Sequence, residues 1–242
     1  MKLALISDIH GNLEALRAVL SDIDKQDVDK IHCLGDIIGY GCNPTECLDL
    51  VAQSCDIILL GNHEYVALGL LEESAMNEVA RQSTEWTCDH LSDSNLETIA
   101  NLDLEASVEN TYLVHACPYE PDQWHYMLRP EEAVVGFDNF IEQIGFFGHS
   151  HVPMIFTLYP QGTCSAKPGH DIDPDPDCRY LVNVGSVGQP RDLDPRSSYV
   201  IYDSESRDVR FHRVEYDIGL VQQKMTKANI HSMLVERLLV GR

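Results

Sequence analysis

The chain has 242 residues, 44% of them hydrophobic, and its 39 acidic side chains outnumber 17 Lys and Arg to give a net charge of −22. This length suits one domain over residues 1–242, and no apolar run approaches the roughly 18 residues that a membrane helix needs. So much negative charge disfavours a nucleic-acid duplex or an anionic membrane as a partner. The eight cysteines are scattered and form no C-x-x-C, and the chain shows no signal-peptide pattern. Both features indicate a cytoplasmic protein with reduced thiols.

Short apolar strands alternate with helices at the start of the chain. The hydrophobic pattern predicts strands at 2–6, 30–34 and 56–60 and helices at 13–23 and 44–54. Such alternation is typical of βαβ units with a parallel sheet, where ligands bind beyond the carboxyl ends of the strands. Each of these strands is followed by a polar cluster: Asp8-Ile9-His10, Gly35-Asp36 and Gly61-Asn62-His63-Glu64. On an extended backbone, residues 8 and 10 point to the same side.

The middle of the chain adds more strands that end in histidine. Helical sequence covers 64–100 with a break near 92–95, and Glu64 is expected in a first turn, where acids are favoured. The pattern then predicts a helix at 130–140 and strands at 104–109, 111–114, 145–147 and 154–158. His115 follows the strand at 111–114, and Gly148-His149-Ser150-His151 follows the strand at 145–147.

The last third of the chain is expected to be less regular. Residues 160–178 hold four prolines and two glycines, which predicts a flexible loop with Cys164 and Cys178 as free thiols near its ends. Antiparallel strands are predicted at 179–184, 198–202 and 209–214, and helices over 217–241 with a break near residue 229. These helices either pack on the sheet or form a homo-oligomer contact, and the sequence leaves both alternatives open.

The polar strand ends offer carboxylate, amide and imidazole groups and no thiolate. This chemistry suits manganese, iron or zinc better than a structural thiolate zinc site. The potential ligands are too many for one ion, which points to two ions that share a carboxylate, an arrangement suited to in-line displacement at phosphorus. The collected side chains are those of Asp8, His10, Asp36, Asn62, His63, His115, His149 and His151.

In this order and spacing, from residue 3 to about 190, the clusters resemble the full motif set of the calcineurin-like metallophosphoesterase superfamily. The segment 183–191, Asn-Val-Gly-Ser-Val-Gly-Gln-Pro-Arg, is similar to the small single-domain bacterial and archaeal phosphodiesterase branch of that superfamily. The phosphoprotein phosphatase branch carries Asp and Arg where this chain has Gly39 and Tyr40, which argues against protein phosphatase activity.

The resemblance implies an α/β fold (α+β in some schemes), a four-layer αββα sandwich of two facing mixed sheets with metals at the carboxyl edge of the strands. It implies two divalent or trivalent ions of Mn, Fe, Zn or Ni, with Asp36 bridging them. One ion would be held by Asp8, His10, Asp36 and His151, and the other by Asp36, Asn62, His115 and His149. His63, beside Asn62, would assist the leaving group as a general acid or charge stabiliser.

The implied activity is hydrolysis of phosphodiester or phosphoanhydride bonds by a hydroxide shared between the two ions. The substrate would be a small phosphate ester or nucleotide, with Arg191 and Tyr40 as candidate contacts. Trp124 could stack a nucleobase or simply pack, and packing is favoured. Two alternatives remain open: a dinucleoside polyphosphate hydrolase acting on diadenosine tetraphosphate, and a non-catalytic scaffold of the same fold.

Overall fold

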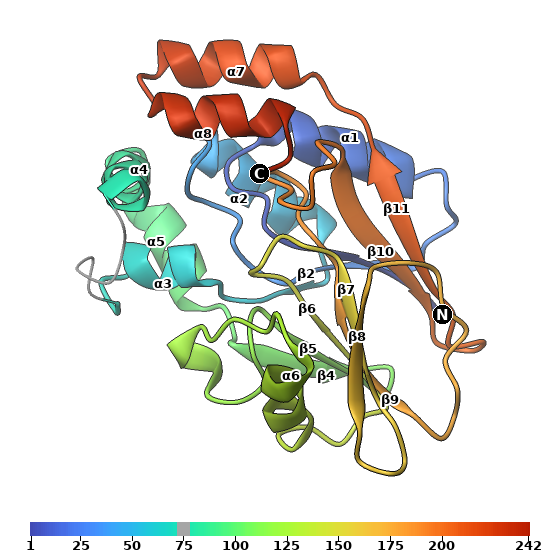
Figure 1. The fold of residues 1–242 in the computed structure, drawn as a ribbon. Coiled ribbons are helices and arrows are strands. Elements are labelled where there is room, and N and C mark those ends of the chain that lie inside the picture. The colour runs from blue at the N-terminus through green and yellow to red at the C-terminus, as the bar shows by residue number, and fades with distance from the viewer. Residues whose placement is uncertain (72–77) are drawn as a thin grey trace.

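A computed structural model of the chain describes residues 1–71 and 78–242 (Figure 1). The described strands form two mixed sheets, one in the order β11-β10-β1-β2-β3 and the other in the order β4-β5-β6-β9-β7-β8. The sheets face each other across a buried apolar layer to which Leu5 of the first sheet and Phe146 of the second both contribute. Helices cover their outer faces, so the predicted αββα architecture is confirmed.

The first sheet carries the start of the chain. Alternation along β1 sends Leu3 and Leu5 toward the second sheet and Ala4 and Ile6 toward the outer helices. β1, β2 and β3 are parallel, whereas β10 runs antiparallel to both of its neighbours. The bounds are β1 Lys2–Ile6, α1 Leu13–Ile23, β2 Lys30–Cys33, α2 Pro44–Ser54, β3 Ile57–Ile58, β10 Ser197–Asp203 and β11 Val209–Val214.

The second sheet is built from the middle of the chain and is covered by helix α6. Phe137 of α6 packs with Leu181 of the sheet in a separate buried cluster. The strand β9 runs parallel to β6 and antiparallel to β7, so it is antiparallel on one side only. The bounds are β4 Glu105–Val108, β5 Thr111–Val114, the 3₁₀ turn η2 Pro121–Gln123, α6 Pro130–Phe137, β6 Ile144–Phe147, β7 Met154–Leu158, β8 Cys164–Pro168 and β9 Arg179–Asn183.

The prediction of a loop throughout 160–178 is wrong in part. Residues 164–168 form the strand β8, which pairs with β7 along its whole length. Proline did not prevent this because β8 is an edge strand, where a missing N–H is tolerated. Residues 169–178 are irregular apart from a bridge between Ile172 and Val209. Cys164 and Cys178 are free thiols, as expected.

In the described part of the predicted helical stretch 64–100, the structure has the short helices α3 Asn62–Ala67, α4 Glu78–Cys88 and α5 Asp93–Ala100. The predicted break is real, because the Ser92 hydroxyl accepts a hydrogen bond from the main-chain N–H of Asn95 and begins α5 there. Residues 72–77 of that predicted stretch lie outside the described residues.

The C-terminal helices are α7 Ile218–Lys227 and α8 Ser232–Glu236, followed by the 3₁₀ turn η3 Arg237–Leu239. They lie beside α1 and α2 rather than on a sheet (Figure 1), and Lys224 of α7 forms an ion pair with Glu14 of α1 at 2.6 Å. Across the described residues, none of the helices has the length and apolar character needed to span a bilayer.

Candidate metal centre

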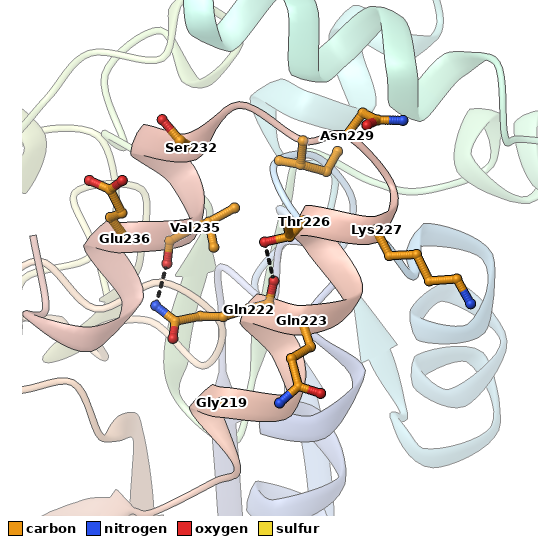
Figure 2. A pocket seen from close by; sticks show the side chains of 10 residues that line it. Gly219, Gln222, Gln223, Thr226, Lys227, Asn229, Ser232, Val235 and Glu236 are labelled. Atoms are coloured by element: carbon orange, nitrogen blue, oxygen red, sulfur yellow. Dashed lines mark hydrogen bonds between the residues drawn. The ribbon is translucent and has the colours of Figure 1, made fainter.

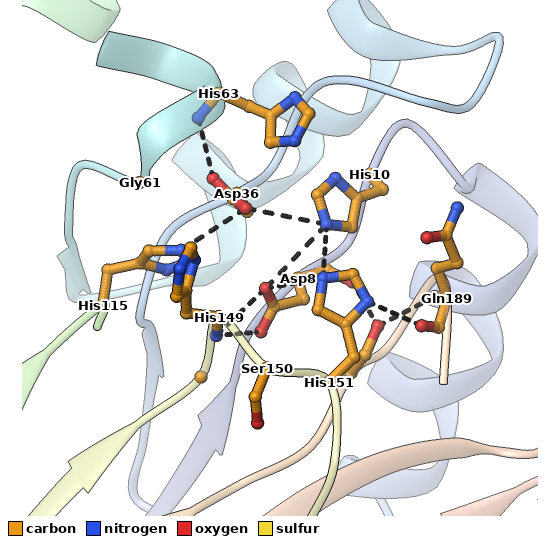
Figure 3. Close-up of polar contacts among 12 residues, drawn as sticks. Asp8, His10, Asp36, Gly61, His63, His115, His149, Ser150, His151 and Gln189 are labelled. Atoms are coloured by element: carbon orange, nitrogen blue, oxygen red, sulfur yellow. Dashed lines mark hydrogen bonds and ion pairs between the residues drawn. The ribbon is translucent and has the colours of Figure 1, made fainter. Parts of the chain in front are cut away.

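The loops that follow β1, β2, β5 and β6 bring six of the predicted ligands together (Figure 3). The side chains fall into two groups, in each of which one potential ligand atom per residue lies within 4.8 Å of the others. Asp36 belongs to both groups, and all six side chains are buried. The first group is Asp8, His10, Asp36 and His151, and the second is Asp36, His115 and His149.

An extended backbone was expected at residues 8–10, but the structure does not have one there. Asp8 and His10 have φ of 54° and 50°, in the left-handed region that side chains rarely adopt. The conformation is held by the neighbouring loop, since the main-chain N–H of Asp8 donates to Gly35 O at 3.0 Å and that of His10 donates to Asp36 O at 3.0 Å. Such strain of order 1–3 kcal/mol per residue is typical of functional sites.

Three of the imidazoles are oriented by the main chain. Their Nδ1 atoms lie against carbonyl oxygens, at 3.0 Å from Ile38 O for His10, 2.9 Å from Leu34 O for His115 and 2.7 Å from Gln189 O for His151. A carbonyl can only accept, so each Nδ1 carries the proton and a neutral ring then presents a bare Nε2. Metal-binding histidines are usually held in this way.

Unprotonated imidazole nitrogens that face one another indicate a binding site for a cation. The Nε2 atoms of His10 and His151 lie 3.0 Å apart, and two neutral rings protonated at Nδ1 have no proton to place between them. Among the other candidate ligands, Asn62 Oδ1 and His149 Nε2 are buried without a hydrogen-bond partner among the described residues, and His115 Nε2 faces the Asp36 carboxylate at 3.4 Å. Buried polar atoms are rarely left unpaired. The donor set therefore fits metal ions that accept imidazole, carboxylate and amide ligands.

Burial and neighbouring charges keep most side chains of the cluster in the protonation state that can bind a metal ion. Burial lowers the pKa of His10 and His151, and it lowers that of His149 to about 3, so these rings are neutral at neutral pH. Burial opposes ionisation of Asp36, but the neighbouring imidazoles, His115 first, hold its pKa well below the usual value. Burial likewise opposes a charge on His115, and Asp36 outweighs it to raise the pKa of His115 to about 9.

Glu64 has a structural role that was not predicted from the sequence. This side chain lies in the first turn of α3, as expected, but it is completely buried. Its carboxylate accepts four main-chain N–H groups at 2.8–3.0 Å, those of Gly61, Asp36, Ile37 and Ile38. Glu64 therefore fixes the loop that carries Asp36. The signal in the sequence was the capping pattern Gly61-x-x-Glu64.

Residue 61 has to be a glycine because the main chain passes very close to Asp36 and Glu64 at this position. A Cβ at this position would lie 2.2 Å from Asp36 Oδ1 and 2.8 Å from a Glu64 carboxylate oxygen, far inside van der Waals contact. The missing side chain lets α3 begin directly against Asp36, whose Oδ1 accepts the main-chain N–H of His63 at 3.0 Å. The N-terminus of this helix consequently delivers His63 to the edge of the cluster (Figure 3), and Asn62 is the first residue of the same helix.

His63 lies beside the two ligand groups and belongs to neither. Its ring is buried and meets His10 edge to face, with centroids 4.8 Å apart, and its Nδ1 has no hydrogen-bond partner among the described residues. Burial lowers its pKa. Gly39 forms one wall, since a Cβ on Gly39 would lie only 2.2 Å from His63 Nδ1. An imidazole held here can give or receive a proton next to the cluster.

Aromatic and cationic side chains border the cluster. Tyr40 packs on His63 with centroids 4.5 Å apart, and the Arg191 guanidinium carbon lies 5.7 Å from the Tyr40 ring centroid. Tyr126, which the sequence argument did not select, is half exposed and stacks on His149 at 4.2 Å. Trp124 is buried against Tyr65 and His115, so packing, the favoured alternative, is what the structure shows.

A separate groove of about 940 Å³ lies between α7 and α8 (Figure 2). It is lined by polar side chains such as Gln222, Thr226 and Glu236, and it includes none of the residues of the cluster.

Comparison with known proteins gives consistent matches. Residues 1–207 match the family model of the calcineurin-like phosphoesterase superfamily domain. An uncharacterized protein of Methanocaldococcus jannaschii is 39% identical over 99% of this chain and 98% of its own. A crystal structure of a metallophosphoesterase from Sphaerobacter thermophilus is 37% identical, with a TM-score of 0.87 over 100% of this chain and 99% of its own. A hypothetical protein of Pyrococcus horikoshii, 16% identical, shares the fold with a TM-score of 0.78 over 100% of this chain and 98% of its own.

Proposed function

The chain belongs to the calcineurin-like phosphoesterase superfamily, and from that premise we propose that it is a metal-dependent hydrolase of phosphodiester or phosphoanhydride bonds. The observation that carries the proposal is the facing pair of bare Nε2 atoms on His10 and His151, 3.0 Å apart, next to a second group of ligands that shares Asp36. Groups arranged in this way are suited to holding two cations, and a small phosphate ester or nucleotide is the substrate class that such a centre handles.

In this proposal, one cation would be held by Asp8, His10, Asp36 and His151, and the other by Asp36, Asn62, His115 and His149. Bound cations of Mn, Fe, Zn or Ni would acidify a water molecule to a pKa of about 7 and neutralise phosphoryl oxygens. That neutralisation lets an anionic ester approach a protein of net charge −22. Bare imidazole nitrogens and ionised carboxylates provide the site without a large reorganisation of the protein.

His63 acts as a general acid or charge stabiliser in this scheme. It is the imidazole of the site that lies outside both ligand groups, and its Nδ1 is not used by the described residues. Its ring N–H can donate a hydrogen bond to the leaving-group oxygen and stabilise the charge that develops there, and a doubly protonated ring can transfer a proton to that oxygen. Either role is worth roughly 10²–10⁴-fold in rate. Asn62, the neighbour of His63 in the chain, has a buried Oδ1 without a hydrogen-bond partner among the described residues. Arg191 and Tyr40 contact the substrate, and the cytoplasm is the proposed location.

The test is hydrolysis of bis-p-nitrophenyl phosphate by protein loaded with Mn, Fe, Zn or Ni, with metal content measured on the same samples. We expect turnover that chelation abolishes. His63→Ala should keep its metal and lose about 10²–10⁴-fold in kcat, whereas His170→Ala, an exposed loop histidine, should match the unsubstituted protein. Full metal content with no turnover on a panel of phosphate esters would instead favour a non-catalytic scaffold.

A further inference from the structure

A small aromatic pocket lies beside the second group of candidate ligands. Its volume is about 360 Å³, and it is lined by Cys117, Tyr119, His125, Tyr126, Glu132 and Val135. The Tyr126 ring stacks on that of His149, with centroids 4.2 Å apart and planes inclined by 28°. Cys117 follows His115 by two residues in the chain. Both histidines belong to the ligand group that shares Asp36 with the first group. The pocket and the candidate metal centre therefore share a wall.

The loop that carries the three rings of the pocket is anchored at several points. Trp124 and Met127 are buried on either side of residues 125 and 126, and Met127 packs in the apolar cluster under α6. The Glu132 carboxylate of α6 accepts the main-chain N–H groups of Leu128 and Arg129 at 2.7 and 3.0 Å. These contacts fix the backbone that presents the rings. The pocket is thus formed before any ligand arrives, as small-molecule sites usually are.

This loop keeps aromatic surface exposed to solvent. Tyr119 and Tyr126 are 40% and 51% exposed, and the Tyr119 and His125 rings lie nearly parallel with centroids 6.0 Å apart. Glu120 and Trp124 have φ of 48° and 56°, a left-handed conformation that is unfavourable for residues other than glycine and is concentrated at ligand sites. Exposed apolar surface beside a site of convergent polar groups is typical of a ligand-binding groove.

The charges around the pocket favour a neutral ligand group over a phosphate. The described residues that line it include no Lys or Arg, so a phosphate would find no cation there. The carboxylate of Glu132, which also lines it, forms an ion pair with Arg129 at 2.7 Å in addition to its main-chain hydrogen bonds. What the pocket offers a ligand is mainly the faces and edges of aromatic rings, with the apolar side chain of Val135 beside them.

We propose that this pocket binds the planar aromatic group of the substrate, stacked on the exposed part of Tyr126, while the phosphate is held at the metal centre. Stacking requires only a flat ring, so different bases or aryl groups can bind. This inference rests on the proposed function and narrows its substrates to nucleotides and other aromatic phosphate esters. It makes Tyr126 and Val135 residues that determine specificity, separate from the residues that hold the metal ions.

The first test needs neither metal nor activity. Adenosine and ribose are titrated into chelator-treated protein, and binding is followed by ligand-observed NMR. We expect adenosine to bind and ribose not to bind. Tyr126→Ala should weaken adenosine binding about tenfold, whereas Tyr126→Phe keeps the ring and should bind within twofold of the unsubstituted protein. Met233→Ala, which removes a side chain of similar exposure (55%) from α8, should have no effect. Equal adenosine affinity in Tyr126→Ala and Met233→Ala overturns the inference, and so does a failure of adenosine to bind.

The second test fills the pocket from the side of α6. Val135 is 45% exposed there, and in Val135→Trp the indole ring would take the space of the ligand ring. In manganese-loaded protein, calorimetry should show adenosine 5′-monophosphate binding at least tenfold tighter than ribose 5-phosphate. Val135→Trp should abolish this preference and leave the metal content and the affinity for ribose 5-phosphate within twofold. A preference that survives in Val135→Trp would refute the proposed contact.

Two other outcomes have a definite meaning. If Val135→Trp changes the sedimentation of the protein and leaves adenosine binding as it was, this surface is a contact between copies of the chain, and the inference is wrong. If the protein takes up no metal, or hydrolyses none of the phosphate esters once loaded, the proposed function fails. The adenosine titration of metal-free protein still decides in that case whether the pocket binds an aromatic ring.

Discussion

Replacing Glu64 with alanine should destabilise the protein more than any surface change, because it removes the acceptor of four buried main-chain N–H groups. A hydrogen bond to a charged group contributes about 1.5–3 kcal/mol, and an unsatisfied buried donor costs about 1–3 kcal/mol. Water entering the space recovers part of this, and burial together with the charge of Asp36 raises the pKa of Glu64 to about 7, which weakens its ionised form. We therefore expect a loss of about 3–5 kcal/mol.

The assay is thermal unfolding in the presence of a chelator, so that metal binding does not contribute. For a chain of this size, 1 kcal/mol corresponds to about 2–4 °C in Tm, so Glu64→Ala should melt at least about 6 °C lower. Glu64→Gln keeps one acceptor oxygen and should lose roughly half as much. Glu97→Ala, on the exposed face of α5, should shift Tm by less than about 2 °C. A Glu64→Ala variant that melts within about 2 °C of the unsubstituted protein would refute this reasoning.

Three further predictions concern the metal centre. Gly39→Ala should lower kcat by about tenfold or more with little change in metal content, because the new Cβ displaces the His63 ring; unchanged kinetics would contradict that packing. Metal binding at pH 7.5 should release about one proton, since His115 has a pKa of about 9 without metal and must lose its proton to ligate; calorimetric heats that do not vary with the buffer's ionisation enthalpy would argue against this. Removing the metal with a chelator should lower Tm by several degrees, because ions that bind only the folded state stabilise it. An unchanged Tm would mean that no ion binds the folded site.

Much of the fold could be predicted from the sequence because its strands are short and apolar and polar residues mark where many of them end. β1, β5, β7, β11, α1 and α2 begin and end where the hydrophobic pattern places them. β8 was missed because prolines within 160–178 were read as breaking regular structure, and only pairing with β7 shows that an edge strand tolerates Pro168. The position of the C-terminal helices was also open, since it depends on contacts such as Lys224 with Glu14 that no local pattern specifies.

The convergence of the candidate ligands could be anticipated because parallel strands end at one edge of a sheet. Their local conformation could not: left-handed Asp8 and His10 depend on hydrogen bonds from a loop more than twenty residues away. Glu64 was placed correctly in a helix turn, yet its burial under the Asp36 loop is a tertiary contact.

Two cations with Asp36 between them, as proposed for this chain, can be located directly in a crystal. The most direct measurement is an anomalous-scattering map from a crystal of the manganese-loaded protein. We expect two peaks per chain, about 3.5–4 Å apart, one among Asp8, His10 and His151 and the other among Asn62, His115 and His149. A single peak, or peaks that do not adjoin Asp36, would contradict it.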